Sequence, residues 1–485
     1  MHKGCVIGFT TGNIGRMEIA TETERKYDVA ADFELPRLSG LGAAEKHELD
    51  ATYYDTDDLR LARNRRTLRR RTGGSDAGWH LKTPGEGASR TEHRMPLNSA
   101  DVPSELIAEV RAIVRDQPLK PQVRLRTTRV ETPLRDADGR TLALIAQDAV
   151  TAETGGQMQR WQEIEVELVD GSAKVLKTVD KALLAAGATR SGSVSKLARA
   201  LGDRLSTPKV KSDKIHPVLA YAQQQRRDLE AHDPGVRRGE PEAVHKMRVA
   251  TRRLRSTLKT FKRSFDPELA PRVADDLKWL AQLLGEVRDG QVLSHKLLQG
   301  VEFTAVAARI SKYLDDKVKR GTDALEAELT GERYLKLLDT VDALVEAGVE
   351  EDNPLRRACK ALNKADGLLD EATADGVDGE LHEARKSYKR ARYAVEVFET
   401  SAGKPAAQLI KRLTALQDVL GAHQDSVVAR EILQELAGAA HSAGETAFPY
   451  GIVYARQEEV GRNTMGELPA AVVASREQKL RSWLN

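Results

Sequence analysis

The sequence predicts a multidomain α+β protein with a strand-rich first part and an all-α second part. Residues 18 to about 205 contain strand-like runs separated by turn residues, whereas nearly everything from His216 onward repeats with helical period. The chain has 485 residues, more than one hydrophobic core usually supports, so two or three domains are expected. We expect domains at 18–205 and 215–480, joined by a linker at 206–214 with the sequence STPKVKSDK.

Bulk composition excludes several classes of protein. A net charge of +3 gives no overall attraction for a polyanion, so any polyanion-binding surface must be local. Cys5 and Cys359 are too few for a disulfide framework. No apolar run approaches the roughly 20 residues that span a bilayer, and residues 1–16 are too polar for a signal peptide. We therefore expect a cytoplasmic protein without membrane contact, with Met17 as a second candidate translation start.

Turn residues divide the first part into antiparallel hairpins. The stretch DLRLARNRRTLRRRTGGSDAGWHLKTPGEG alternates strand, Gly-rich turn and strand. The stretch VETPLRDADGRTLALIAQDAV repeats this pattern around Asp138-Gly139. A further strand, WQEIEVELVDG from Trp161 to Gly171, is closed by another turn.

Charged residues alternate along these strands. In TETERKYDV, Glu22, Glu24 and Lys26 share one face, because strand side chains point to opposite faces in turn. For a single strand, a solvated face is the simpler interpretation. Over six strands, a closed barrel with one water-filled charged interior is favoured. The other charged rows are Arg69 with Arg71, His80 with Lys82, Arg90 with Glu92 and Arg94, Arg124 with Arg126, and Glu163 with Glu165 and Glu167.

Such an interior has two kinds of wall. Its Arg and Lys side chains suit the oxygens of a phosphate chain. Glu22, Glu24, Glu165 and Glu167 suit Mg²⁺ or Mn²⁺, which take oxygen ligands and bridge to substrate phosphates. The two walls together predict a site for a metal-bound triphosphate.

The first part resembles the CYTH superfamily, also called triphosphate tunnel metalloenzymes. Its E-x-E-x-K signature is matched by Glu22, Glu24 and Lys26. Further matches are YYDT at 53–56, LRRR, the lysine of WHLK, R-x-E at Arg90, Asp148, EIEVEL and Ser195-Lys196. The resemblance spans residues 18–205 and implies an eight-stranded antiparallel β tunnel with flanking helices.

The resemblance also implies roles for single residues. Glu92 is expected to orient the cations beside it, and His80 receives no role. Arg129 is an additional candidate for binding phosphate, while Arg94 and Glu163 fit a structural or a functional role equally well. The implied metal ligands are Glu22, Glu24, Asp148, Glu165 and Glu167; the phosphate-binding residues are Lys26, Arg69, Arg71, Lys82, Arg90, Arg126 and Lys196; the catalytic residues are Glu22, Glu24, Lys26 and Lys82.

The helical part contains an internal repeat. AVHKMRVATRRLRSTLKTF, from Ala243, aligns with ELHEARKSYKRARYAVEVF, from Glu380. Downstream, LLGEVRDGQVL from Leu283 aligns with VLGAHQDSVVA from Val419. The copies are about 137 residues apart, far longer than a solenoid period. This spacing predicts two bundle-like halves related by a pseudo-two-fold.

One face of each repeated helix is strongly basic. From His245 to Phe265 the chain carries eight Lys and Arg residues and no acid. Like charges at helical spacing oppose helix formation, so an anion-binding surface is favoured over a solvated face. Few aromatic or amide side chains accompany these cations, so a phosphate polymer fits better than nucleic acid.

The pattern H-x-x-R-x-x-x-R-R-x-R, present as HKMRVATRRLR and HEARKSYKRAR, resembles the conserved histidine α-helical domain (CHAD). The resemblance covers residues 215–480 and implies two four-helix bundles that bind inorganic polyphosphate. The second copy has Lys389 in place of an arginine and Gln424 in place of Arg288, so weaker binding is expected there. The implied polyphosphate-binding residues are His245, Arg248, Arg252, Arg253, Arg255, Lys259, His382, Arg385, Lys389, Arg390 and Arg392.

Together, the two resemblances imply a bacterial-type inorganic triphosphatase. The expected reaction is metal-dependent hydrolysis of inorganic triphosphate or short polyphosphate, with Mg²⁺ or Mn²⁺ as cofactor and longer polyphosphate held by the helical part. The resemblance also allows association with polyphosphate granules. Two alternatives stay open: a class IV-type adenylyl cyclase that uses the same metal-triphosphate site, and a non-catalytic polyphosphate-binding or scaffold protein.

Overall fold

The computed structural model describes residues 17–85, 89–205, 215–298, 301, 303–350, 352–375 and 378–484. The chain divides into two compact units, Met1–Lys209 and Val210–Asn485. The expected linker at 206–214 and the N-terminal segment with Cys5 lie outside the described residues.

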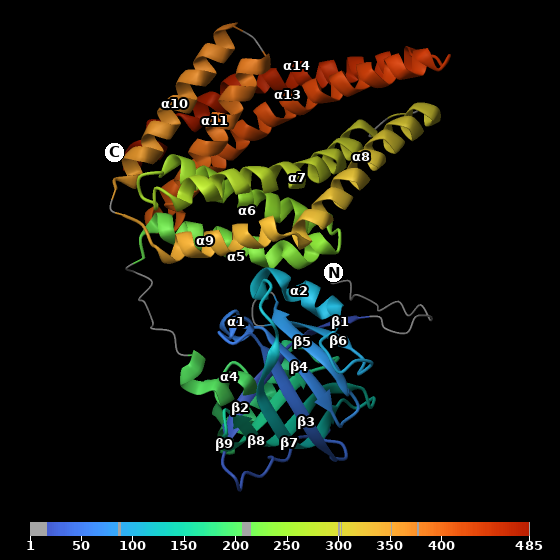
Figure 1. The fold of residues 1–485 in the computed structure, drawn as a ribbon, viewed down its shortest axis with the longest axis vertical. Coiled ribbons are helices and arrows are strands. Elements are labelled where there is room, and N and C mark those ends of the chain that lie inside the picture. Colours follow the sequence, from blue (N-terminus) through green and yellow to red (C-terminus); the bar gives the residue numbers. More distant parts are fainter. Residues whose placement is uncertain are drawn as a thin grey trace. The chain divides into compact units, whose positions relative to one another are not determined.

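The first unit is a curled antiparallel sheet with short helices around it (Figure 1). Every pairing between its neighbouring strands is antiparallel, as the turn pattern predicts. The strands are β1 (Glu18–Glu22), β2 (Glu24–Val29), β3 (Glu45–Asp55), β4 (Thr67–Thr72), β5 (Gly78–Pro84), β6 (Arg90–Met95), β7 (Lys120–Arg135), β8 (Thr141–Thr154), β9 (Gln157–Leu168) and β10 (Thr189–Arg190). The helices are α1 (Arg60–Arg63), α2 (Ser104–Val114), α3 (Ala173–Ala185) and α4 (Lys196–Leu201), followed by a 3₁₀ turn, Gly202–Leu205.

The curl of the sheet follows from the pairing of β1 and β2. The strands lie in the order β1-β6-β5-β4-β3-β7-β8-β9-β2-β10. Strand β1 pairs with β6, β2 pairs with β9, and Thr23 alone separates β1 from β2, so one run of chain joins both sides of the sheet. The described sheet has ten strands instead of the expected eight, because that run is divided at Thr23 and the two-residue β10 adds to β2.

The turn between β4 and β5 requires glycine. Gly73 has a φ of 81°, and a Cβ atom there would lie 2.0 Å from the carbonyl oxygen of Glu48. The turn between β7 and β8 contains Gly139, which also has a positive φ, of 82°. Nothing lies within 4 Å of a Cβ at Gly139. The glycines of the two predicted turns therefore have nearly the same positive φ and differ in how crowded their surroundings are.

Apolar side chains fix two helices to the outer face of the sheet, which we define as the face that carries Leu68, Leu81, Ile145 and Ile164. Helix α2 packs against the first two of these residues through a cluster that includes the fully buried Trp79. Helix α3 packs against the last two. The opposite, inner face carries most of the charged residues that the sequence analysis selected.

The second unit is entirely helical in its described part (Figure 1). None of the described helices combines the length and apolarity that a bilayer crossing requires. The helices are α5 (Pro217–Arg237), α6 (Pro241–Thr260), α7 (Leu269–Leu298), α8 (Thr304–Thr330), α9 (Glu332–Glu346), α10 (Pro354–Asp375), α11 (Asp378–Glu396), α12 (Glu399–Ala402), α13 (Lys404–Ser442), α14 (Phe448–Ser475) and α15 (Gln478–Arg481), followed by the 3₁₀ turn η3 (Ser482–Leu484).

The helices pack mainly with their neighbours in sequence. In the first half α6 packs against α5 and α7, and α7 packs against α8 and α9; in the second half α11 packs against α10 and α13, and α13 packs against α14. The aligned repeat segments thus form α6 with α7 and α11 with α13. The pairing of α6 with α11 joins the halves. The expected arrangement as two four-helix bundles stays a prediction.

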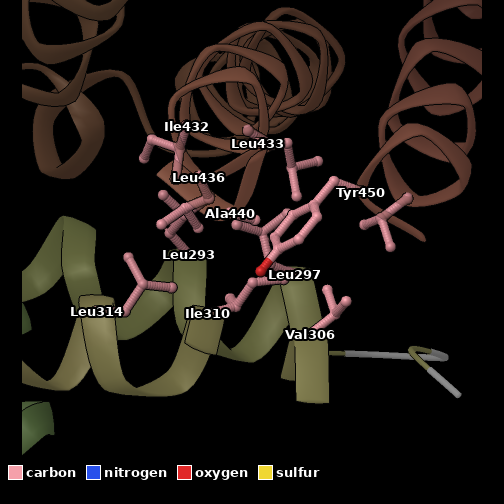
Figure 2. Packing of buried hydrophobic residues seen from close by; sticks show 12 residues of the cluster. Leu293, Leu297, Val306, Ile310, Leu314, Ile432, Leu433, Leu436, Ala440 and Tyr450 are labelled. Carbon is pink, nitrogen blue, oxygen red and sulfur yellow. The ribbon is translucent and has the colours of Figure 1, made fainter. Parts of the chain in front are cut away.

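A second contact between the halves lies at the far ends of the long helices (Figure 2). Leu293 and Leu297 of α7, with Ile310 of α8, pack against Leu436 of α13 and Tyr450 of α14. These side chains are buried, so the ends of the two hairpins α7–α8 and α13–α14 stabilise each other.

Replacing Gly73 with Ala tests the crowded turn. We expect the Gly73→Ala variant to lose about 2 kcal/mol or more of unfolding free energy, because the new Cβ meets backbone as well as the positive φ. The matched Gly139→Ala variant has the same φ and open space, so we expect a loss of about 1 kcal/mol. Urea unfolding of both variants measures the difference, and equal losses would contradict the role of the Glu48 contact.

Candidate functional site

Strand register brings the charged rows to one face of the sheet. Residues directly opposite each other on paired strands point to the same face. Arg69 is opposite both Tyr53 and His80, and Lys82 is opposite Glu92. Lys26 is opposite Glu165. The inner face brings together the predicted residues Glu22, Glu24, Lys26, Arg69, Arg71, Lys82, Arg90, Asp148, Glu165 and Glu167.

Arg126 does not lie on this face, so its expected contact with a phosphate in the sheet interior is wrong. It is opposite Asp50 and Thr151, its side chain is 58% exposed, and its nearest carboxylate is that of Asp50 at 4.0 Å. Near Arg126, the inner positions of β7 are held by Val123 and Leu125, which pack against α4. The sequence argument assumed that apolar residues face away from the charged interior, but β7 carries both kinds on the same face.

Arg129 occupies the inner position that was expected for Arg126. Its guanidinium donates to both oxygens of Asp148 at 2.8 and 2.7 Å and to Glu165 at 2.9 Å. Burial opposes its charge, but these carboxylates raise the pKa of Arg129. The alternation of Val123, Leu125, Thr127 and Arg129 in the sequence could have found it.

Three carboxylates meet around Lys196. Oxygens of Asp148, Glu163 and Glu165 lie within 4.8 Å of one another, and the Lys196 ammonium lies 2.9, 2.7 and 2.7 Å from them respectively. Lys26 also pairs with Glu165. Burial would raise the pKa of Glu165, but Lys196, Lys26 and Arg129 hold it well below its usual range. We call these three carboxylates the neutralised group, because protein cations already compensate them.

Three residues with expected roles lie in this arrangement. Asp148 and Glu165 are predicted metal ligands, yet their oxygens contact Lys196 and Arg129. Lys196 is a predicted phosphate-binding residue, yet its three short contacts are all to carboxylates. All three belong to one ion-pair network, and their expected roles stay predictions. Glu163, left open by the sequence, belongs to the same group and also accepts a hydrogen bond from Trp161 Nε1 at 2.6 Å.

A second set of carboxylates, Glu22, Glu24 and Glu167, contains one member without a cation partner in the part of the chain that the structure describes. Glu24 and Glu167 lie directly opposite each other on β2 and β9. Glu22 pairs with Lys82 and lies 3.3 Å from Arg94, and Glu24 lies 3.3 Å from Lys26, whereas Glu167 has no ion pair among the described residues. Burial, and next the charge of Glu22, raise the pKa of Glu167 to about 7. Burial also raises the pKa of Glu22, although Lys82 opposes it. We call this set the open group.

The open group fits a divalent cation better than the neutralised group does. The charges of Glu22 and Glu24 add to burial in raising the pKa of Glu167, and a hard cation with oxygen ligands compensates such an excess of negative charge. Glu22 and Glu24 are also two of the predicted metal ligands, and Glu167 is a third. The chemistry of the donors, all carboxylate oxygens, suits Mg²⁺ or Mn²⁺.

Buried arginines form the opposing wall. Arg69 donates to the Tyr53 hydroxyl at 3.2 Å, and Arg71 pairs with Asp76. The Nε atoms of Arg69 and Arg71 are buried without a hydrogen-bond partner. Buried donors in native proteins are normally satisfied, so these two donors are available to an anion on this face.

Glu92 connects this wall to the open group. It accepts hydrogen bonds from Arg94 and His80, and the Lys82 ammonium lies 3.6 Å away. Burial would raise the pKa of Glu92, but the His80 hydrogen bond and the Lys82 charge keep it low. His80, to which the sequence assigned no role, contacts Glu92 through Nδ1 at 3.1 Å and the Asp76 carbonyl oxygen through Nε2 at 2.9 Å. His80 therefore holds Glu92 in place.

The YYDT match is structural apart from Tyr53. Asp55 is buried and accepts backbone N–H groups of Thr56, Leu61 and Ala62 at 2.8–2.9 Å. It thereby fixes the short helix α1 next to the sheet. Arg90 has an inner position opposite Glu22, and its guanidinium donates to the carbonyl oxygen of Val194.

In the helical unit, α6 and α11 bring predicted cations of both repeats together. Arg252, Arg385 and Lys389 have no ion pair among the described residues, and the Nε atoms of both arginines are buried without a partner. Burial, then the charges of Arg385 and Arg252, lower the pKa of Lys389 to about 7. We call these three residues the unpaired cluster. The repulsion among these three cations favours binding of an anion.

Other predicted polyphosphate-binding residues are tied to acids. Arg248 contacts both oxygens of Asp289 at 2.8 and 2.9 Å. Arg253 and Arg392 contact the buried Glu396 at 2.9 and 2.6 Å. These pairs were hidden from the sequence analysis, because in two of the three the acid lies on another helix.

The remaining predicted residues lie around the cluster. Arg390, followed by burial and Arg255, lowers the pKa of Lys259, so these three cations repel one another across the two helices. His382 shares a hydrogen bond with Gln424 at 2.9 Å. Burial and then Arg288 lower the pKa of His245. The aligned histidines thus face aligned residues of α7 and α13.

Comparison with known families agrees with the division of the chain into a strand-rich and a helical unit. A CYTH domain model matches residues 20–201, and a CHAD domain model matches residues 220–434. The uncharacterized protein Rv2226 of Mycobacterium tuberculosis is 38% identical over 498 residues, which cover 93% of this chain and 95% of that protein. The chain belongs to the CYTH–CHAD family.

Solved structures resemble parts of the CYTH–CHAD chain. PptA from Streptomyces chartreusis is 18% identical, covers 53% of this chain and 97% of its own, and has a TM-score of 0.45. HpAC1 from Hippeastrum, whose structure is described as revealing a dominant triphosphatase activity, is 16% identical, covers 37% of this chain and 94% of its own, and has a TM-score of 0.23.

Replacing Lys196 with Met tests the neutralised group. We expect a loss of about 3 kcal/mol of unfolding free energy at neutral pH, because two buried carboxylates and the partly buried Glu165 lose their shared partner. In the native protein Glu165 and Asp148 have lowered pKa values, so their stabilisation is present above their ordinary values of 4.5 and 3.8 and is lost as the pH falls through the lowered values.

The difference in unfolding free energy between the native protein and the Lys196→Met variant should therefore become smaller below about pH 4. Unfolding at several pH values measures it. The control is Lys177→Met, which removes an exposed lysine of α3 and should change stability by less than about 0.5 kcal/mol. A constant difference at all pH values would contradict the charge balance described here.

Proposed function

We propose that this CYTH–CHAD protein hydrolyses inorganic triphosphate or short polyphosphate in its CYTH domain, with Mg²⁺ or Mn²⁺ as cofactor, and binds longer polyphosphate through its CHAD domain. The observation that carries the proposal is the open group, with Glu167 unpaired, on the same inner face as arginines whose buried donors lack partners. A metal-bound polyphosphate supplies what each side lacks, a cation for the carboxylates and oxygens for the arginines.

Each residue of the CYTH domain has a defined part in this proposal. Glu22, Glu24 and Glu167 hold the metal, which when bound neutralises phosphate oxygens and activates water. Arg69 and Arg71 bind phosphate oxygens through their free Nε donors. Lys82 lies between Glu22 and Glu92, so it can contact an anion at the boundary between the two walls. Lys26 and Arg90 are further phosphate contacts on this face.

The supporting residues keep the remaining charges balanced. Lys196 and Arg129 compensate Asp148, Glu163 and Glu165, so these carboxylates do not repel the substrate. Glu92 orients Lys82 and Arg94, and His80 orients Glu92. Positioning of this kind is the main contribution that proteins make to phosphoryl transfer, because substrate and metal supply the reacting groups.

Product analysis separates this proposal from the two alternatives. Purified protein is incubated with triphosphate, ATP or long-chain polyphosphate in the presence of Mg²⁺ or Mn²⁺, and phosphate, pyrophosphate and cyclic AMP are measured. Phosphate from triphosphate supports the proposal. Cyclic AMP from ATP indicates an adenylyl cyclase, and no product from any substrate indicates a binding or scaffold protein.

Replacing Glu167 with Gln tests the metal assignment. We expect at least a tenfold weaker Mn²⁺ affinity by calorimetry and roughly a hundredfold lower triphosphatase activity, because one of three charged ligands is lost. In the native protein the pKa of Glu167 is about 7, so this carboxyl is protonated at lower pH and metal affinity should fall as the pH drops below that value.

Glu153→Gln is the matched control for this experiment. Glu153 is exposed and lies opposite Arg124 on the outer face of the same sheet. Its replacement should leave metal affinity and activity unchanged. Full activity of Glu167→Gln, or an equal loss in both variants, would remove Glu167 from the metal site.

Adjacent arginines test the CHAD domain. Arg252 is unpaired, whereas Arg253 pairs with Glu396. We expect Arg252→Ala to weaken polyphosphate binding about tenfold at moderate salt with little loss of stability. We expect Arg253→Ala to cost about 1–2 kcal/mol of unfolding free energy with a smaller effect on binding. Binding titrations and urea unfolding of both variants measure the two effects, and unchanged binding in Arg252→Ala would remove the unpaired cluster from the site.

A further inference from the structure

The two CHAD repeats provide the same seat for an arginine. In the first repeat the guanidinium of Arg248 lies over Gly285 of α7, where a Cβ atom would be 3.5 Å from Nη2. In the second repeat the guanidinium of Arg385 lies over Gly421 of α13, where a Cβ atom would be 3.4 Å from Nη2. An aspartate follows each glycine by four residues, one helical turn later on the same face.

The two aspartates have different partners. Asp289 of the first repeat binds Arg248 through both oxygens at 2.8 and 2.9 Å. Asp425 of the second repeat instead accepts from the ammonium of Lys296 on α7 at 2.5 Å. The repeat position that corresponds to Lys296 is Ile432, so only one half carries the competing lysine.

We propose that Lys296 acts as a positioning residue for polyphosphate binding, because it occupies Asp425 and thereby leaves Arg385 free to bind a phosphate group. This inference rests on the polyphosphate-binding role proposed for the CHAD domain. Without Lys296, Asp425 would bind Arg385 as Asp289 binds Arg248, since the seats are equivalent. The unpaired cluster would then lose one of its two arginines.

The surroundings of Arg385 favour this competition. Asp425 and Asp289 are the acids that act on its charge, and Arg248 repels it. Lys389 is repelled by Arg385, Arg252 and Arg248 and attracted by Asp425. Asp425 is the carboxylate that acts on both Arg385 and Lys389. When Lys296 pairs with Asp425, more of the positive charge of these two residues remains for an anion.

The pair contributes little to stability. The side chains of Lys296 and Asp425 are 45% and 37% exposed, and ion pairs this exposed have small effects on unfolding. A change in binding on removal of Lys296 is therefore separable from a change in folding.

A double-mutant cycle between Lys296 and Arg385 tests the proposal. Full-length Lys296→Met, Arg385→Met and the double variant are titrated with inorganic polyphosphate of defined length at fixed salt. We expect each single variant to bind roughly tenfold more weakly, since one charge-assisted phosphate contact is lost. We expect the double variant to bind as Arg385→Met does, because Lys296 acts only through Arg385.

Two further variants control for charge and chemistry. Lys319→Met removes an exposed lysine of α8 that pairs with Asp323 and should leave affinity unchanged. Lys296→Arg keeps the cation that binds Asp425 and should restore native affinity. Melting temperatures within a few degrees of the native protein should accompany every variant.

The outcomes distinguish this inference from the proposed function. Native affinity of Lys296→Met, or additive losses in the double variant, overturns the positioning role while Arg385→Met still weakens binding. Absence of polyphosphate binding by the native protein overturns the CHAD role and the inference together.

Discussion

The structure of the CYTH domain depends on the ion pairs that surround Lys196. A buried carboxylate costs several kcal/mol unless a cation compensates it, and two buried carboxylates and the partly buried Glu165 converge on this one ammonium. Helix α4 holds the ammonium in place. The Ser195 hydroxyl caps the helix by accepting from the Ala198 N–H at 3.0 Å, while Leu197 and Leu201 pack into the adjacent apolar cluster. In the Ser195-Lys196 match, Ser195 therefore caps helix α4 and Lys196 is the counter-ion of the three carboxylates.

The neutralised group is compensated by protein cations, whereas the open group contains a carboxylate, Glu167, without a cation partner among the residues that the structure describes. This difference between the two groups indicates where a ligand can bind. If every acid on the inner face were paired, the face would be a structural network with no need of a ligand. Glu167 lies opposite Glu24 and has no ion pair in the described part of the chain, and the raised pKa of Glu167 follows from burial near Glu22. The surplus of negative charge beside arginines with unused donors is what distinguishes a binding site from a salt-bridge network.

Strand periodicity in the sequence was sufficient to find the inner face, but it could not assign every row to it. Rows such as Glu22, Glu24 and Lys26 were correctly grouped because register carries their alternation across the sheet. The prediction for the row of Arg124 and Arg126 was wrong. Helix α4 fills part of the interior with apolar residues, so β7 turns Val123 and Leu125 inward and its charged row outward. Ion-pair partners such as Lys196 with Glu163 also escaped prediction, since nothing in a local pattern identifies an acid that lies elsewhere in the chain. The division at Thr23 likewise depends on pairing with two different strands.

In the CHAD domain the excess charge is positive, and two basic helices must pack against each other despite it. Helices α6 and α11 repel each other through their cations, and Glu396 opposes that repulsion. Its carboxylate accepts from Tyr221 of α5 at 2.7 Å and contacts Arg253 of α6 and Arg392 of α11. One buried acid thus links three helices and consumes two of the predicted polyphosphate-binding arginines. Because those two arginines secure the contact, the helices can keep Arg252, Arg385 and Lys389 close together although none of the three has an ion pair among the described residues, and this cluster keeps an excess of positive charge.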